Sequence, residues 1–315
     1  MMKDAHVFSH YKEAVIGAIT DLAAEHDDIV FLDADLSSCI GSTSFQKAYP
    51  DRFFNCGIAE ANMAGVAAGL ASMGFTPFIH SFGCFASRRD YDQLFISVGY
   101  THQTVHVIGS DPGITAQYNG GTHMPFEDIA LFRQIPGFVI IEPSDAQSLY
   151  ALTQQVYENG HSSYIRTPRK GIVYRYDPRA EIVLGKGIEL LDGQDVAIVA
   201  TGALMVDAAL AAAELLKEKG INATVVDLHT IRPLDTDLID KIASRTGHVL
   251  VCENGRYCGG VGEMIAGYLV QTNPVKMSFL NVGERFGEVG NLQYLSQAFG
   301  FTADNIVDKV EALIK

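Results

Sequence analysis

Hydrophobic positions in the first half of the chain occur as short runs separated by longer mixed segments. Apolar runs at residues 29–33, 76–81, 104–108 and 138–142 have the length and composition of buried strands, and a helical or loop segment follows each. Strands that alternate with helices in this way form a parallel sheet covered by helices. The pattern therefore predicts an α/β fold.

The pattern changes about halfway along the chain. Residues 172–186 mix glycine, proline and charged side chains, as a linker or a small hairpin does. Beyond them the order strand, helix, strand returns, and another strand and helix follow. We expect two domains, each a mainly parallel sheet flanked by helices: residues 1–175 and residues 186–315, with a linker at 176–185.

One carboxylate, that of Glu60, lies at the start of an apolar helical segment. Phe53 and Phe54 precede it, and small and aliphatic residues recur at helical spacing over residues 59–73. Burying an ionised carboxylate is costly unless it is paired, so the group either keeps its proton or finds a dedicated donor. Both outcomes suit proton exchange with a heterocycle. The alternative is that Glu60 caps the helix and interacts with its free N–H groups and its dipole.

Composition narrows the function classes. A chain of 315 residues, 48% of them apolar, can build two domains with ample core, and its net charge of −14 argues against a nucleic-acid-binding protein. The five cysteines are scattered without a Cys-x-x-Cys, so we expect no metal site on this chain and no disulfide framework. Nothing resembles a membrane span or a secretory signal, so we expect a cytoplasmic protein without membrane contact.

Two polar stretches carry further candidate chemistry. Aromatic residues follow the second apolar run, and a flat heteroaromatic ring could stack on them, although they could also form a core cluster. Residues 110–137 begin with a long glycine-rich loop, which leads into a helix after Pro125 and contains His123. An imidazole titrates near neutrality. A glycine cluster at Gly259–Gly262 could bind phosphate, but tight turning between strand and helix is the favoured interpretation.

The segment from Asp51 to Gly74, DRFFNCGIAEANMAGVAAGLASMG, resembles the cofactor-activating segment of thiamine-diphosphate enzymes of the transketolase family. The resemblance implies that Glu60 is catalytic and hydrogen-bonds the aminopyrimidine ring of thiamine diphosphate. It also implies that the last domain mainly builds the dimer.

The segment SFGCFASRRDYDQLF is similar to the family stretch whose aromatic residues pack around the aminopyrimidine. The similarity points to Phe85 as the main cofactor-binding aromatic, with Phe82 and Tyr91 beside it. One of the two adjacent arginines is expected to face the cofactor, and Arg89 is our candidate.

The loop Asn119-Gly-Gly-Thr-His123 matches a family pattern in which the histidine contacts substrate beside the reactive carbon, so the resemblance gives His123 a catalytic and substrate-binding role. Two departures point to an altered sugar pocket: Asn119 stands where the family carries Asp, and Asp111 stands near the place of another substrate-binding His. At Arg166 the family uses Arg to hold the substrate phosphate, and a guanidinium suits a phosphate because it binds two oxygens at once.

Full-length members of the family hold the diphosphate through a metal at a Gly-Asp-Gly segment, and no Gly-Asp-Gly occurs in this sequence. The resemblance therefore covers the C-terminal half of a split enzyme. It implies a separate N-terminal transketolase subunit that binds Mg²⁺ or Ca²⁺ and the diphosphate, self-association of this chain into a dimer, and a heterotetramer of two copies of each chain.

The implied reaction moves a two-carbon ketol unit between sugar phosphates. Two related enzyme classes stay open as alternatives: 1-deoxy-D-xylulose-5-phosphate synthase chemistry and the β subunit of a 2-oxo acid dehydrogenase E1. A non-catalytic regulatory or scaffolding subunit is the alternative outside enzymes. The sequence does not identify the sugars or the partner chain.

Overall fold

The computed structural model describes residues 7–315, and the chain divides into two compact units. Unit 1 covers Met1–Pro112 and Leu131–Leu184, and unit 2 covers Gly113–Ala130 and Gly185–Lys315. The chain thus leaves unit 1 after Pro112, contributes an 18-residue stretch to unit 2, and returns.

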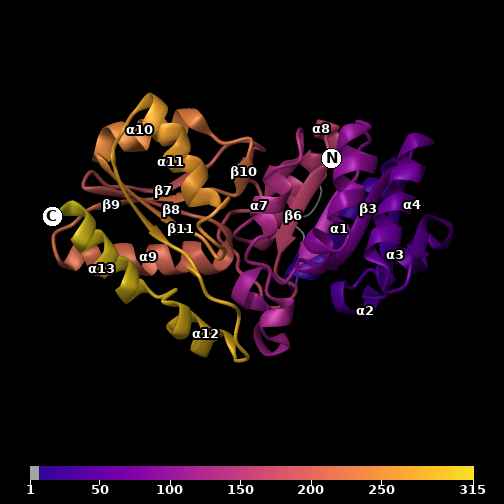
Figure 1. Cartoon of the computed structure of the whole chain (residues 1–315), viewed down its shortest axis with the longest axis horizontal. Coiled ribbons are helices and arrows are strands. Elements are labelled where there is room, and N and C mark those ends of the chain that lie inside the picture. Colours follow the sequence, from indigo (N-terminus) through magenta and orange to yellow (C-terminus); the bar gives the residue numbers. More distant parts are fainter. Residues whose placement is uncertain (1–6) are drawn as a thin grey trace. The chain divides into compact units, whose positions relative to one another are not determined.

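Parallel strands form the sheet of unit 1 (Figure 1). Its strands run side by side in the order β5-β6-β4-β3-β1-β2, and their bounds are β1 Ile29–Asp33, β2 Phe53–Asn55, β3 Thr76–Phe82, β4 His106–Ser110, β5 Val139–Ile141 and β6 Ser163–Thr167. Neighbouring strands pair in parallel register, and β1, β4, β5 and β6 are buried along their whole length. The four apolar runs of the sequence are thereby confirmed as strands of a parallel sheet, whereas β2 carries no long apolar run.

Helices surround this sheet. They are α1 Tyr11–Glu25, α2 Ser37–Ile40, α3 Thr43–Ala48, α4 Glu60–Ser72, α5 Phe85–Arg88, α6 Tyr91–Gln93 and α8 Ala146–Asn159, with short helices η1 Pro50–Arg52 and η2 Leu94–Tyr100. Helix α8 begins at a capping box in which Asp145 accepts a hydrogen bond from the Ser148 N–H. It ends at Gly160, whose φ of 73° is a left-handed value that glycine adopts without strain.

Unit 2 contains the second sheet, in which five strands follow the order β12-β11-β8-β9-β7. The bounds are β7 Ile188–Asp192, β8 Val196–Ala200, β9 Ala223–Asp227, β11 His248–Cys252 and β12 Lys276–Leu280, and a short strand β10 spans Thr230–Arg232. All pairs are parallel except β7 with β9, which are antiparallel and so form the one exception within a mainly parallel sheet. The predicted fold class is therefore confirmed.

The helices of unit 2 are α9 Gly202–Glu218, α10 Thr236–Thr246, α11 Val261–Thr272, α12 Leu292–Phe299 and α13 Ala303–Ile314. Figure 1 shows α10 and α11 on one side of the strands and α9 and α13 on the other. Its core joins inward side chains of β8 and β11 to α9 and α13, with Ile198, Leu250 and Val310 fully buried. Helix α7, Asp128–Arg133, lies where the chain returns to unit 1.

The inserted stretch of unit 2 contains two short helices, η3 Gly113–Asn119, with a backbone kink at Gln117, and η4 Gly121–His123. Four of its apolar side chains are buried in the core of unit 2: Ile114, Ala116, Met124 and Phe126. This burial explains why the stretch belongs to unit 2, although unit 1 precedes and follows it.

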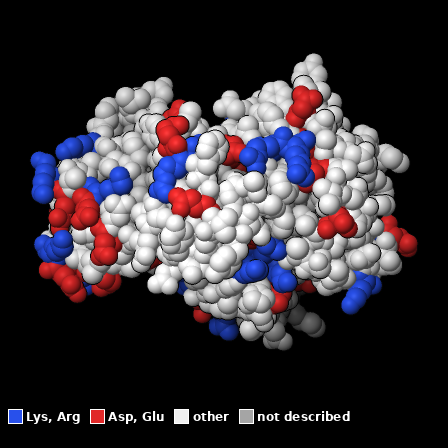
Figure 2. Space-filling view, turned by 60° about the horizontal axis from the view of Figure 1, so that its bottom comes forward, with Lys and Arg blue, Asp and Glu red and all other residues white. Residues whose placement is uncertain are grey.

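On the face in Figure 2, Lys and Arg side chains are interspersed with Asp and Glu rather than gathered in one basic area. No helix within residues 7–315 is both long enough and apolar enough to cross a membrane. In the same range no cluster of three or more His, Cys, Asp or Glu side chains could hold a metal ion.

Candidate active site

The carboxylate of Glu60 is buried at the first residue of α4, with 4% of the residue exposed. Its Oε1 accepts a hydrogen bond from Nη1 of Arg89 at 2.9 Å and another from the hydroxyl of Ser81 on β3 at 3.3 Å. The residue before it, Ala59, is the N-cap, and α4 has no side-chain cap bond. Glu60 therefore has dedicated donors from other elements instead of capping its own helix.

Arg89 connects this carboxylate to an aromatic surface. Its guanidinium carbon lies 3.8 Å from the centre of the Phe85 ring, while its side chain is 47% exposed. The rings of Phe85 and Phe82 are 6.2 Å apart and tilted by 57°, and both residues are partly exposed. The planar guanidinium of Arg89 thus donates to the buried carboxylate of Glu60 and also covers the accessible ring of Phe85.

This arrangement fits a heterocycle that carries N–H groups. Such a ring could take the place of the guanidinium, because it can donate to Glu60 and stack on Phe85 in the same way. Arg89 would then have to move aside, and its half-exposed side chain can do so without unpacking the core. The donors and acceptors present therefore suit a planar, aromatic N–H donor ligand.

The row of contacts continues from Phe82 to Arg169 and Asp111. The Arg169 guanidinium carbon lies 4.8 Å from the Phe82 ring, and its Nε donates to Oδ2 of Asp111 at 2.8 Å. Asp111 directly follows β4 with a left-handed φ of 59°, which is uncommon for a residue with a side chain. The Arg169 backbone N–H also donates to Asp111, which fixes both residues.

Arg166, the expected phosphate ligand, is fully buried in β6, and its Nη1 forms an ion pair with Oε1 of Glu142 at 2.5 Å. A substrate phosphate would have to displace this carboxylate to reach the guanidinium. The phosphate role of Arg166 stays a prediction, and Arg169, which lies over the Phe82 ring, is a second candidate.

The other predicted residues have contacts of their own. The ring of Tyr91 lies 6.0 Å from that of Phe95, and burial raises the pKa of the Tyr91 hydroxyl. Asn119 and His123 belong to unit 2; Asn119 is exposed, and Nδ1 of the half-buried His123 lies 2.9 Å from the Thr122 hydroxyl. The predicted roles of these residues, like those of Glu60 and Phe85, stay predictions.

Two buried polar groups next to the site were missed by sequence reasoning. His80 on β3 contacts Asp33 and Ser110, both at 3.0 Å, and so joins the carboxyl ends of β1, β3 and β4. The signal was available, since the carboxyl ends of neighbouring parallel strands lie at one edge of a sheet. Asp90, next to Arg89, is fully buried, and burial together with the charge of Glu60 raises its pKa well above its usual range.

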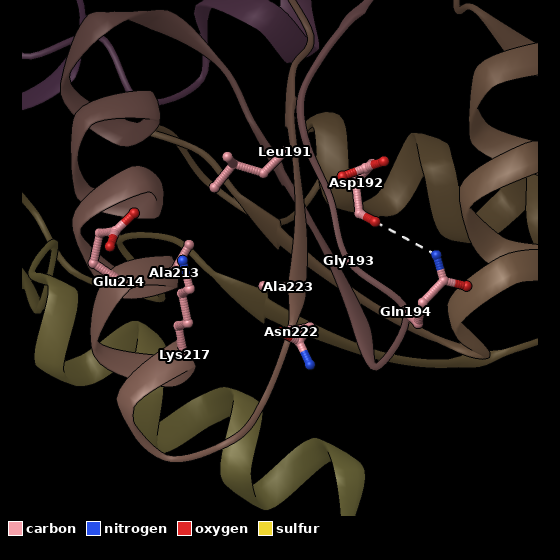
Figure 3. A pocket seen from close by; sticks show the side chains of 9 residues that line it. All are labelled: Leu191, Asp192, Gly193, Gln194, Ala213, Glu214, Lys217, Asn222 and Ala223. Carbon is pink, nitrogen blue, oxygen red and sulfur yellow. Dashed lines mark hydrogen bonds between the residues drawn. The ribbon is translucent and has the colours of Figure 1, made fainter.

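A shallow pocket of about 340 Å³ in unit 2 contains none of these residues. Figure 3 shows it between the turn after β7 and helix α9, which contributes Ala213, Glu214 and Lys217 to its lining. Its mixed charges give no indication of a specific ligand.

Comparison with known proteins places the chain in a family. The model of the transketolase pyrimidine-binding domain matches residues 9–173, and that of the transketolase C-terminal domain matches residues 185–306. The chain belongs to the transketolase family. The resemblance in the sequence is thereby confirmed, and members of this family generally use thiamine diphosphate.

Two relatives of similar length are named as subunits of transketolases. The chain is 44% identical to the 6-deoxy-6-sulfo-D-fructose transketolase subunit of Clostridium sp., over 94% of this chain and 92% of the relative. It is 31% identical to an apulose-4-phosphate transketolase subunit of Phocaeicola vulgatus, over 96% of this chain and 97% of the relative. A solved structure described as a split gene transketolase, inactive β4 tetramer, matches with a TM-score of 0.88 and 35% identity, over 97% of this chain and 98% of that one.

Proposed function

We propose that this chain is the C-terminal subunit of a split, thiamine-diphosphate-dependent transketolase. The observation that carries the proposal is the buried Glu60 carboxylate, held by a planar N–H donor that also covers the Phe85 ring. When bound, thiamine diphosphate stabilises the negative charge that develops as the carbon–carbon bond beside a ketose carbonyl breaks. Glu60 and Phe85 would hold the aminopyrimidine end of this cofactor.

Each residue has a defined task in this proposal. Glu60 exchanges a proton at its carboxylate with the aminopyrimidine, and Phe85 and Phe82 orient the ring. Arg89 moves out of the position that the ring occupies. His123 holds or moves a proton at a substrate hydroxyl, because a neutral imidazole can both accept and donate.

The proposed substrates are sugars with an anionic group far from the reacting carbonyl. The relatives' names support this class, since one names a sulfonated sugar and the other a phosphorylated one. Arg166 or Arg169 would bind the anion, and Asn119 and Asp111 would contribute to the sugar pocket. We propose a sugar phosphate as the substrate and treat a sugar sulfonate as the second candidate.

The proposed partner is a separate N-terminal subunit that holds the diphosphate and its Mg²⁺ or Ca²⁺. Relatives of equal length named as subunits support this division, as does the description of the solved β4 tetramer as inactive. The proposed assembly contains two copies of each chain.

The decisive experiment is the variant Glu60→Gln in the complex with its partner. Gln keeps the size and hydrogen bonding of the side chain but cannot exchange the proton, so hydrogen exchange at C2 of the cofactor should slow about 100- to 10,000-fold. Rapid-quench NMR measures this rate, and calorimetry checks that the cofactor still binds. Glu158→Gln, at the exposed end of α8, is the matched control. An exchange rate equal to that of the control would remove Glu60 from this role.

A further inference from the structure

The turn that carries His123 is fixed at both ends by residues that follow β11. The backbone N–H of Ile114 donates to Oδ1 of Asn254 at 3.1 Å, and the backbone N–H of Arg256 donates to the Phe126 carbonyl at 2.8 Å. Gly113 has a left-handed φ of 50°, and a side chain there would overlap Asn254. These contacts therefore hold both ends of the loop in place against the residues that follow β11.

The middle of the same loop meets residues 283–290, the stretch before α12 (Figure 1). Gly121 and Gly287 approach so closely that a Cβ on Gly121 would lie 2.5 Å from the Gly287 carbonyl oxygen. Conversely, a Cβ on Gly287 would lie 2.7 Å from Cα of Gly121. Real Cβ atoms do not come this close to backbone, so both positions require glycine.

The contact between Gly121 and Gly287 is close in the chain to the imidazole of His123. His123 lies two residues after Gly121 in η4, and its backbone N–H donates to the Gly120 carbonyl at 3.0 Å. Gly120 itself has a φ of 74°, and a Cβ there would lie 2.8 Å from the Val289 side chain. A shift of residues 287–289 therefore moves the turn that presents His123.

Residues 283–290 are themselves held by Arg256. Its guanidinium donates to the carbonyls of Gly283 and Arg285, both at 3.1 Å, while its backbone N–H holds the loop at Phe126. Glu288 accepts one hydrogen bond within the stretch, from Arg285 at 2.6 Å, and one from the Tyr294 hydroxyl of α12 at 3.0 Å. Arg256 thus contacts both the loop that contains His123 and residues 283–290, which pack on that loop.

We propose that residues 283–290 of unit 2 position His123 for the substrate through the contact between Gly121 and Gly287, with Arg256 as the residue that sets their spacing. The inference rests on the proposed substrate role of His123. It gives the C-terminal domain a task in substrate handling beyond subunit association.

The test is Gly287→Ala in the complex with its partner. The added methyl group would overlap Cα of Gly121 and the side chain of Met124, so it must separate the His123 turn from residues 283–290 by several tenths of an ångström or more. Misplacement on this scale lowers kcat/KM about 10- to 100-fold. Exchange at C2 of the cofactor should keep its wild-type rate, because Glu60 lies in unit 1. Gly267→Ala, in an exposed turn of α11 with no atom within 4 Å of the new Cβ, is the control and should retain full activity.

A double variant separates this inference from the function on which it rests. If the stretch acts through His123, Gly287→Ala should cause no further loss in a His123→Ala background. Full activity of Gly287→Ala, beside an impaired His123→Ala, overturns the inference and leaves the proposed function intact. Full activity of His123→Ala refutes the role of that residue, and the inference with it.

Arg256→Ala provides a second test of the inference if Gly287→Ala does not fold. It removes the two contacts to the carbonyls of Gly283 and Arg285 without adding atoms, and it should lower kcat/KM in the same way while C2 exchange stays unchanged. Arg256→Lys, which retains one donor group, should recover part of the loss. Equal losses in turnover and in C2 exchange would overturn the inference, because they indicate general unfolding.

Discussion

Arg166 and Arg169 stand three residues apart, and each forms an ion pair with a buried carboxylate. Arg166 is fully buried against Glu142, whereas Arg169 is 9% exposed, pairs with Asp111 and lies over the partly exposed Phe82 ring. A ligand that contacts Phe82 can meet the Arg169 guanidinium first, because Arg166 has no exposed surface. We therefore expect alanine substitutions at Arg166 and Arg169 to have different effects on activity and stability.

Arg169→Ala should lower kcat/KM about 10- to 100-fold for a phosphorylated substrate, since a charge-assisted hydrogen bond contributes about 1.5 to 3 kcal/mol. A substrate analogue without the phosphate should lose much less. Steady-state kinetics with both substrates measures the difference. Arg166→Ala is the comparison: it should lower the free energy of unfolding by about 3 to 5 kcal/mol and impair both substrates equally. If Arg166→Ala alone discriminates against phosphate, Arg166 is the anion ligand.

His106 makes stability depend on pH. It is fully buried on β4, with Nδ1 2.9 Å from the Ser163 hydroxyl, and burial lowers its pKa to about 3. The unfolded chain takes up this proton near the usual value of about 6.5, so below that pH the unfolded state binds more protons. Stability from this group is therefore complete above pH 6.5 and falls as the pH decreases, by up to about 1.4 kcal/mol per pH unit.

His106→Asn should remove this contribution and flatten the decline. Urea unfolding at several pH values between 7.5 and 4.5 gives the slope of stability for both proteins. His161→Asn, at an exposed position of the same unit, controls for the loss of one histidine. A slope for His106→Asn that equals the wild-type slope would show that other groups cause the acid sensitivity.

At the scale of elements, the glycine cluster before α11 accommodates a carboxylate of the protein itself. Glu253, at 1% exposure, accepts from the backbone N–H of Val261 at 2.7 Å and of Gly262 at 3.0 Å. A Cβ on Gly262 would lie 3.2 Å from Oε1 of Glu253, so the small residue allows the close approach. The N–H groups that a phosphate could have used at this helix start are thus occupied.

Glu253→Ala should lower the free energy of unfolding by about 1 to 3 kcal/mol, because two buried N–H groups lose their acceptor at the positive end of α11. Denaturant unfolding measures the loss. Glu218→Ala, at the exposed end of α9, should stay within about 0.5 kcal/mol of the wild type. If both substitutions have the same effect, the carboxylate does not stabilise this helix start.

At the scale of the whole molecule, the chain has two folded units, but its sequence contains no Gly-Asp-Gly segment of the kind that holds the metal and diphosphate in full-length members of the family. Each unit has its own sheet and buried core, so the isolated chain should fold. Without the proposed partner it should bind thiamine diphosphate weakly and show no transketolase activity, since the charged end of the cofactor has no metal clamp.

Calorimetry with Mg²⁺ and thiamine diphosphate, with and without the partner, measures this dependence. Light scattering coupled to gel filtration should show self-association of the isolated chain and a complex with two copies of each chain after mixing. The complex of Glu60→Gln with the partner is the control, because it should assemble normally without turnover. Tight cofactor binding or turnover by the isolated chain would contradict the split-enzyme proposal.

The sequence alone determined the features that depend on neighbouring residues. The apolar runs of β1, β3, β4 and β5 specify buried parallel strands, because only strands covered on both faces tolerate continuous apolar character. The segment around Glu60 was sufficient to indicate the family, since its spacing and small residues are local properties.

Only the tertiary structure decided which distant residues meet. Arg89 lies between Glu60 and Phe85, and Arg166 pairs with Glu142, because strand order and side-chain packing bring together segments that are 24 to 29 residues apart. The loop of His123 belongs to unit 2 for the same reason: its apolar side chains are buried where residues 196–313 form a core. Local pattern fixes which face of an element is apolar, but the fold fixes what that face meets.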